Sequence, residues 1–173
     1  MSISREVLER YVGPGVCFVE TGARWGDTMI RAMELGASQV RSCESDYLQH
    51  AMAWAHVRDA LRDGPWFLHQ GESTRFLRDY SPCTSLQVVY FLDAHTETKS
   101  PLLAEIDLIR ETMDKRWIGR PVTILIDDWR IVQAGTWGFG VDHVFDALTN
   151  IGPHTRTFEP GVVPEDILVA RFE

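Results

Sequence analysis

The 173-residue sequence lacks any apolar run long enough to span a membrane. Its first twelve residues are rich in charge and contain no apolar segment of the kind found in secretory signal peptides. It also lacks an excess of basic residues, because the formal net charge is −8, whereas proteins that bind a nucleic-acid backbone usually present a basic face. We therefore expect a soluble, cytoplasmic protein that has no membrane partner and no nucleic-acid partner.

Several common ligand motifs are missing as well. The sequence contains neither the GxGxxG fingerprint of nicotinamide enzymes nor the GxxxxGK[ST] sequence of a phosphate-binding P-loop. Its three cysteines are an odd number without the CxxC spacing of a zinc site. These absences disfavour a dehydrogenase, a P-loop nucleotidase and a zinc protein.

The order of apolar segments predicts one α/β domain over residues 1–173. Five apolar, β-branched runs are each followed by a segment with helical spacing, and two further strands close the chain as a hairpin. This pattern predicts a doubly wound, Rossmann-like sheet of about seven strands, mostly parallel, with an antiparallel last strand. The expected strands are 16–19, 39–43, 66–69, 86–92, 122–126, 155–158 and 167–172. The expected helices are 2–12, 27–35, 46–62, 74–80, 100–113 and one that begins near 141.

A glycine-containing turn, ETGARWGDT at Glu20–Thr28, follows the first expected strand. Gly22 and Gly26 allow the backbone to approach a ligand closely, and the N-terminus of the next helix offers unpaired N–H groups to an anionic group. The turn is therefore a candidate ligand site. The alternative is a purely structural strand-to-helix turn.

Acidic residues follow the ends of the five expected parallel strands. In an open α/β sheet these ends lie at one edge, which is where ligands bind. Single acids at such positions are also explained by helix capping and turn preferences, so the argument depends on the whole set. The set consists of Glu20, Glu44, Glu72, Asp93, Asp127 and Asp128.

Two parts of this acidic set predict different ligands. Glu44 ends the second expected strand, where an acid commonly accepts hydrogen bonds from ribose hydroxyls, so it indicates a ligand that contains a nucleoside. Asp93, Asp127 and Asp128 end two strands that we expect to be neighbours, and three converging carboxylates repel unless a cation neutralises them. An oxygen-rich site of this kind suits Mg²⁺. The alternative is that one aspartate caps a helix and another points to solvent.

These residues together resemble the class I S-adenosylmethionine-dependent methyltransferases. Within that class they are most similar to the small metal-dependent O-methyltransferases related to catechol O-methyltransferase, and to sugar O-methyltransferases of the macrocin type. The resemblance implies S-adenosylmethionine and Mg²⁺ as cofactors. It implies a cofactor site made of Glu20, Gly22, Ala23, Gly26, Thr28, Glu44, Gly71, Glu72, Ser73 and Asp93. It implies a metal site made of Asp93, Asp127 and Asp128.

The sequence departs from this family pattern at the general base. The catechol enzymes place a lysine three residues after the first metal aspartate, where this chain has Thr96. His95 is the expected substitute because an imidazole with a pKa near neutrality can accept a hydroxyl proton, and Lys99 is the second candidate. A loop histidine without a catalytic role is the alternative for His95.

Two further departures concern the cofactor turn and the cover of the site. Arg24 and Trp25 are bulky for that turn. Few residues precede the first strand, whereas relatives often cover the site with N-terminal helices. The site is therefore open, or covered by a partner subunit of a homo-oligomer, or no longer catalytic.

The resulting expectation is Mg²⁺-assisted O-methylation of a small or sugar-like hydroxylated substrate. Trp129, Trp137 and Phe139 either form an apolar wall for that substrate or pack their loop onto the domain. Two other functions stay open. One is a methyltransferase-fold binding or interaction domain without catalysis, and the other is an enzyme that uses a nucleotide sugar or a nicotinamide cofactor.

Overall fold

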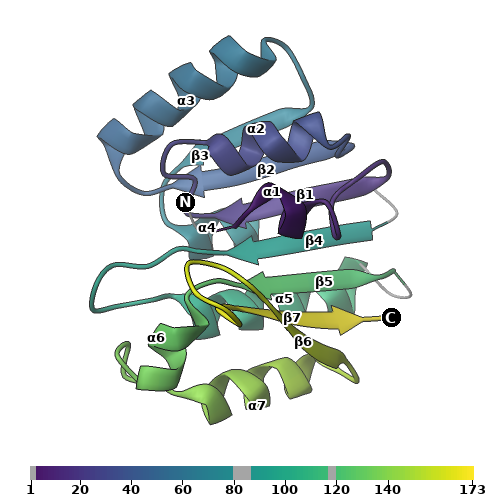
Figure 1. Ribbon diagram of the computed structural model, residues 1–173, viewed down its shortest axis with the longest axis vertical. Coiled ribbons are helices and arrows are strands. Elements are labelled where there is room, and N and C mark those ends of the chain that lie inside the picture. Colours follow the sequence, from purple (N-terminus) through teal and green to yellow (C-terminus); the bar gives the residue numbers. More distant parts are fainter. Residues whose placement is uncertain (1–2, 80–86, 117–119) are drawn as a thin grey trace.

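A computed structural model describes residues 3–79, 87–116 and 120–173, and within these residues seven strands form one sheet with helices on both faces (Figure 1). The strands are β1 (Val16–Thr21), β2 (Gln39–Glu44), β3 (Trp66–Gln70), β4 (Gln87–Leu92), β5 (Val122–Ile126), β6 (Thr155–Glu159) and β7 (Ile167–Phe172). The helices are α1 (Arg5–Leu8), α2 (Asp27–Glu34), α3 (Tyr47–Leu61), α4 (Ser73–Asp79), α5 (Leu102–Arg116), α6 (Trp129–Ala134) and α7 (Val141–Ile151).

The strand order is β3-β2-β1-β4-β5-β7-β6, and the neighbours from β3 to β5 are parallel. The final hairpin places β7 between β5 and β6, antiparallel to both. The predicted fold class is confirmed. Because the chain runs outward from β1 to β3 and then returns to β4 on the other side of β1, the topological switch point lies between β1 and β4.

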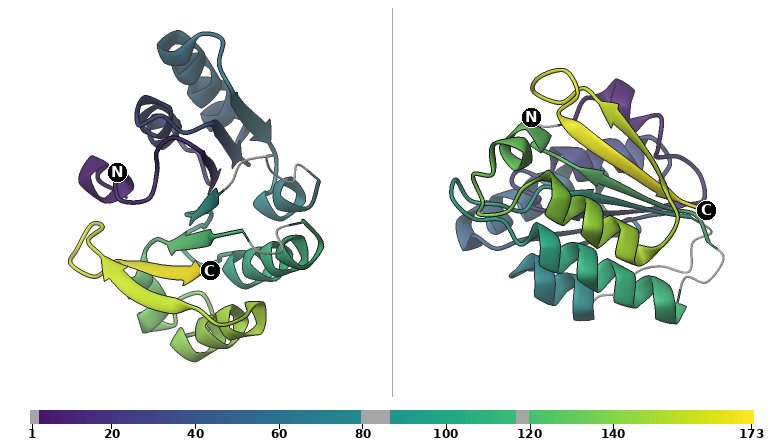
Figure 2. Two further views of the ribbon diagram at one scale, coloured as in Figure 1. Left: turned by 90° about the vertical axis from the view of Figure 1, so that its right-hand side faces the viewer. Right: turned by 90° about the horizontal axis from the view of Figure 1, so that it is seen from below.

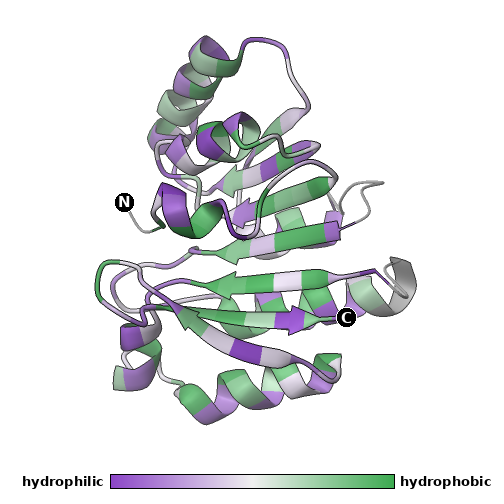
Figure 3. Ribbon diagram, turned by 45° about the vertical axis from the view of Figure 1, so that its right-hand side comes forward, coloured by the Kyte–Doolittle hydropathy of each residue, from purple (hydrophilic) through white to green (hydrophobic). Residues whose placement is uncertain are grey.

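The central strands are apolar because helices cover both faces of the sheet. β4 and β5 are almost entirely buried, and in Figure 3 their ribbons are mainly in the hydrophobic colour. One core cluster lies on the side of α4, α5 and α7, and the other lies on the side of α1, α2 and α3. The two helical layers are visible on opposite sides of the sheet in Figure 2.

Some elements differ from the sequence-based expectation. The first helix is a single turn, Arg5–Leu8, while Tyr11 and Val12 are buried in the turns that follow it. On α3, Ala53 and Val57 pack into the core, whereas the apolar spacing in the sequence predicts a face that is exposed in the structure and consists of Leu48, Ala51, Met52, Ala55 and His56. The short helix α6, which begins directly after Asp128, was not predicted from the sequence. Tyr80 and Leu86, expected as ends of a helix and a strand, lie outside the described residues.

None of the helices in the described part of the chain combines the length and the apolarity that crossing a bilayer requires.

Candidate functional site

The ends of β1, β4 and β5 are aligned at one edge of the sheet. Thr21 pairs with Leu92, and Leu92 pairs with Ile126. The backbone N–H of Asp93 donates to the carbonyl of Thr21 at 3.1 Å, and the N–H of Asp127 donates to the carbonyl of Leu92 at 3.2 Å. The hydrogen-bonded ladder therefore continues through the first acidic residue after each strand, which sets these acids side by side.

The glycines of the Glu20–Thr28 turn are required by close packing. Gly22 has a φ of +85°, and a Cβ added to it would lie 2.7 Å from the carbonyl oxygen of Asp93. Gly26 has a φ of +81°, and a Cβ there would lie 2.5 Å from a methyl carbon of Val57. The turn is thereby pressed against the end of β4 on one side and against α3 on the other. Close packing alone therefore explains why both positions are glycine. The turn also lies beside the switch point, where a ligand-binding turn would be expected.

Glu20 is buried below the turn, with a relative exposure of 2%. The hydroxyl group of Ser42 donates a 2.8 Å hydrogen bond to its Oε2. Burial raises the pKa of Glu20 to about 8, although hydrogen bonds from Ser42 and Thr28 act in the opposite direction. At neutral pH the folded protein therefore favours the protonated carboxyl group of Glu20.

The carboxylate of Glu44 joins the turns that follow β1 and β2. Its Oε2 accepts a 2.9 Å hydrogen bond from the N–H of Arg24, and its Oε1 accepts one of 2.9 Å from the N–H of Asp46. Each carboxylate oxygen has a second lone pair with which it can accept from a ligand hydroxyl. Arg24 itself has a φ of +51°, so the residue that departs from the family pattern also holds an uncommon backbone conformation.

The third predicted cofactor segment, Gly71–Ser73, is attached to the same place. The N–H of Gly71 donates to the carbonyl of Glu44 at 2.9 Å. Ser73 is buried with 5% exposure, whereas the side chain of Glu72 is exposed. All three predicted cofactor segments therefore meet at the ends of β1, β2 and β3, while the acidic group of Glu72 lies at the surface.

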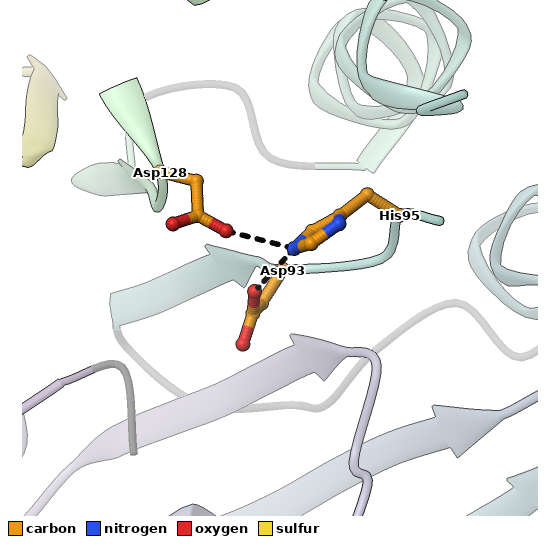
Figure 4. Close-up of side chains that lie close together, drawn as sticks. All are labelled: Asp93, His95 and Asp128. Atoms are coloured by element: carbon orange, nitrogen blue, oxygen red, sulfur yellow. Dashed lines mark ion pairs between the residues drawn. The ribbon is translucent and has the colours of Figure 1, made fainter. Parts of the chain in front are cut away.

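Asp93, which follows β4, and Asp128, which lies after β5, form a compact cluster with His95 (Figure 4). The Nε2 atom of His95 lies 2.8 Å from Oδ2 of Asp128 and 3.5 Å from Oδ1 of Asp93. Hydrogen bonds with Asp128 and Asp93 raise the pKa of His95 to about 10. His95 is therefore an imidazolium at neutral pH in this arrangement, which differs from the neutral imidazole that we expected from the sequence.

Asp128 is held from its other side by Arg130. The Nη2 atom of Arg130 lies 2.5 Å from Oδ1 of Asp128, and its Nη1 atom pairs with Asp166. Contacts with His95 and Arg130 lower the pKa of Asp128. Asp128 has a φ of +54°, in the left-handed region that few residues other than glycine adopt.

Asp166 is a buried acid of the site that the sequence analysis missed. Its exposure is 1%, and it accepts a 3.2 Å hydrogen bond from the N–H of Val162 in addition to its pairing with Arg130. No local signal identifies this pair, because Asp166 and Arg130 are 36 residues apart and meet through the docking of the β6–β7 connection onto α6.

Carboxylate oxygens that could hold a divalent cation lie in two groups that share Asp128, so the predicted metal residues Asp93 and Asp127 do not fall in one group. Within the described residues, ligand atoms of Asp93, His95 and Asp128 lie within 4.8 Å of one another, and those of Asp127, Asp128 and Asp166 form a second such group. A protonated His95 cannot ligate a metal, so the ligands in this arrangement are the four aspartate carboxylates, whose formal charge of −4 is reduced to −2 by His95 and Arg130. Oxygen-rich sites with this charge suit Mg²⁺.

The remaining predicted residues have different positions. The ring of Trp137 is tilted against that of His95, with centroids 5.1 Å apart, and contacts Phe139. Both aromatic residues are partly buried and pack against the core, so they attach their loop to the domain beside the acids. Trp129 is 1% exposed and packs against Phe145 in the core. Lys99 is exposed and forms no ion pair within the described part of the chain.

Comparison of the sequence with protein-family models and with curated proteins gives no match. Among solved structures the chain is similar to an O-methyltransferase from Bacillus cereus in complex with SAH, with a TM-score of 0.65 and 14% identity over 96% of this chain and 77% of that chain. It is also similar to the N-methyltransferase NodS from Bradyrhizobium japonicum, with a TM-score of 0.61 and 14% identity over 97% of this chain and 90% of that chain.

A third similar structure is an rRNA methylase from Streptococcus thermophilus, with a TM-score of 0.60 and 11% identity over 98% of this chain and 92% of that chain. At these identities the similarity establishes the fold and leaves the substrate open. The chain has the fold of class I S-adenosylmethionine-dependent methyltransferases, as its motif resemblance implied.

Proposed function

We propose that this protein is an S-adenosylmethionine-dependent methyltransferase. One observation carries the proposal: the three predicted cofactor segments are hydrogen-bonded to one another at the ends of β1, β2 and β3, beside the acidic cluster that follows β4 and β5. The similar structures that contain SAH support the same cofactor.

The proposed cofactor contacts follow from the position of each segment. The Glu20–Thr28 turn receives the methionine end of the cofactor, and Glu44 receives the ribose hydroxyls through its remaining lone pairs. Gly71–Ser73 borders the adenine. Asp93 lies between the methionine end and the acidic cluster, because its backbone is packed against Gly22.

We further propose that the methyl acceptor is a hydroxyl group of a small or sugar-like substrate. Mg²⁺ bound by Asp93, Asp127 and Asp128 would supply positive charge that lowers the pKa of the acceptor hydroxyl. Methyl transfer then depends mainly on alignment of the acceptor with the sulfonium methyl group, which is the task of the surrounding side chains. Trp137 and Phe139 are placed to form an apolar wall next to this position.

The proton acceptor is assigned to His95, with Lys99 as the second candidate. His95 is the side chain that the structure places against Asp93 and Asp128, and Lys99 is exposed. In the arrangement described, His95 carries a proton and neutralises the acids, so accepting a proton requires a rearrangement of these ion pairs.

Titration calorimetry with S-adenosylmethionine tests the cofactor, and the same titration with a nicotinamide dinucleotide and a nucleotide sugar tests the other open enzyme classes. We expect S-adenosylmethionine to bind with micromolar affinity, and we expect no binding of the nicotinamide dinucleotide or the nucleotide sugar. No detectable S-adenosylmethionine binding would exclude the methyltransferase. Binding without turnover of any acceptor, in a screen that follows the labelled methyl group, would favour a binding domain without catalysis.

A second acceptor class is favoured by the similarity to an rRNA methylase. The net charge of −8 argues against nucleic acid, because phosphate contacts require a basic face. The acceptor screen therefore contains ribosomal RNA beside catechols and sugars. Transfer of labelled methyl to RNA, if it persisted in variants that lack the proposed Mg²⁺ ligands, would contradict the small-molecule proposal.

A further inference from the structure

Glu105 is a buried carboxylate that the sequence analysis did not identify. It lies on α5, in the stripe of apolar positions that contains Leu102, Ile106 and Ile109, and its exposure is 1%. An acid within such a stripe is a recognisable signal, because charged residues are almost never fully buried without a partner. The residue is therefore maintained at a cost to stability.

The carboxyl group of Glu105 has a structural role, because it connects neighbouring segments. Side-chain hydrogen bonds link Glu105 to Ser73, in the turn after β3, and to Thr21, at the end of β1. These contacts connect α5 to two of the cofactor segments. A neutral acceptor such as glutamine would serve this purpose without the cost of burying a charge.

One oxygen atom of the Glu105 carboxylate lacks a hydrogen-bond partner within the described residues. Its Oε1 atom is buried and has no hydrogen-bond partner among residues 3–79, 87–116 and 120–173. Buried polar atoms almost always have a partner, in the protein or in bound water. An acceptor atom in this state indicates a hydrogen-bond donor that comes from outside the described chain.

A small cavity lies at this position. Glu105 lines it together with Asp93, His95, Asp127 and Trp137, and its volume of about 10 Å³ for the centres of water molecules corresponds to one water site. Two of the predicted metal aspartates thus share a water-sized cavity with the unsatisfied carboxylate.

We propose that Glu105 is a positioning residue of the cation site, whose Oε1 accepts a hydrogen bond from a water molecule bound to a divalent cation held by the strand-end aspartates. The inference rests on the metal binding proposed above. Mg²⁺ in proteins usually keeps several water molecules, so a site of this kind needs acceptors for their protons. Groups that hydrogen-bond to the ligands of a metal typically change its affinity 10–100-fold.

The test uses Mn²⁺ as a probe for the Mg²⁺ site and measures binding without substrate, from the loss of the free-ion signal in electron paramagnetic resonance. The variant is Glu105→Gln, whose amide oxygen can retain the contacts with Ser73 and Thr21 and then presents an N–H donor to the cavity. The matched control is Glu111→Gln, which removes an exposed charge from the same helix. Asp128→Asn serves as the ligand variant, and thermal unfolding verifies that each protein is folded.

We expect Glu105→Gln to weaken Mn²⁺ binding at least tenfold, Asp128→Asn to weaken it further, and Glu111→Gln to leave it unchanged. Wild-type affinity in Glu105→Gln, with loss of binding in Asp128→Asn, would overturn the role of Glu105 and leave the metal site intact. Absence of Mn²⁺ binding by the wild type would overturn both the metal site and this inference, while binding of S-adenosylmethionine would still support the methyltransferase. A change in S-adenosylmethionine binding alone would show that Glu105 only connects the turns, which would also overturn the inference.

Discussion

The hydroxyl group of Ser42, on β2, donates a 2.8 Å hydrogen bond to the carboxyl group of Glu20, at the end of β1. This contact crosses between neighbouring strands directly below the proposed cofactor turn. It holds Glu20 in a buried place where the ionised form is disfavoured. Burial of this carboxyl group therefore lowers the stability of the folded protein at neutral pH.

Replacement of Glu20 by glutamine should stabilise the folded protein at neutral and alkaline pH. The pKa of Glu20 is raised from 4.5 to about 8, so the wild type loses stability as the pH rises from 4.5 to 8, because the unfolded chain ionises first. The loss amounts to a few kcal/mol, since each pKa unit corresponds to about 1.4 kcal/mol. The difference in melting temperature between Glu20→Gln and wild type should grow between pH 5 and pH 8.5, and the variant should bind S-adenosylmethionine more weakly. A constant difference over this range would contradict the raised pKa.

Removal of the His95 imidazole should destabilise the metal-free protein in a pH-dependent manner. Because the folded state raises the pKa of His95 from 6.5 to about 10, its contribution is complete below pH 6.5 and disappears as the pH rises through 10. Chemical unfolding in the presence of a chelator should show that wild type has a larger free energy of unfolding than His95→Gln, and this difference should disappear as the pH rises from 6.5 to 10. The double variant with Asp128→Asn provides the control, since most of the His95 effect should vanish when its partner carboxylate is absent. If wild type and His95→Gln differed equally in free energy of unfolding at pH 6 and pH 10, the ion pairs of His95 would be contradicted.

Substitution of Gly22 by alanine should disturb the site through the backbone. The added Cβ would lie 2.7 Å from the carbonyl oxygen of Asp93, and the positive φ adds strain of about 1 kcal/mol or more. We expect a lower melting temperature and a loss of S-adenosylmethionine binding of tenfold or more. Gly13→Ala is the matched control, because a Cβ added there would have no described residue other than its chain neighbours within 4 Å. Wild-type cofactor affinity in Gly22→Ala would remove this turn from the proposed cofactor site.

Neutralisation of Asp166 should release Arg130 and thereby loosen Asp128. Hydrogen bonds to charged groups contribute about 1.5–3 kcal/mol, so Asp166→Asn should lower the free energy of unfolding by an amount in this range. It should also weaken Mn²⁺ binding, because Arg130 is no longer fixed by Asp166 and therefore orients Asp128 less well. Glu165→Gln changes the charge of the exposed neighbouring residue and should have neither effect. If Glu165→Gln and Asp166→Asn behaved alike, the effect would be one of net charge rather than of this contact.

The sequence by itself determined the layout of the fold and the edge of the sheet at which the candidate site residues gather. Apolar runs such as the one that became β4 predict strands buried on both faces, and the order of strands and helices predicts a doubly wound sheet. Acids after such strands must then share one edge, which is why Glu44, Asp93 and Asp128 could be grouped without coordinates. These inferences succeed because they depend on periodicity and chain order, which are local properties.

Only the tertiary structure decided how the acids are partnered. The charge state of His95 depends on its distances from Asp93 and Asp128, and the attachment of Asp128 depends on Arg130 and the distant Asp166. The unsatisfied oxygen of Glu105 likewise becomes visible only when α5 is packed beneath the turns. Burial and electrostatic energies arise from contacts between segments far apart in the chain, so a sequence pattern can place such residues at an edge but cannot assign their partners or their pKa values.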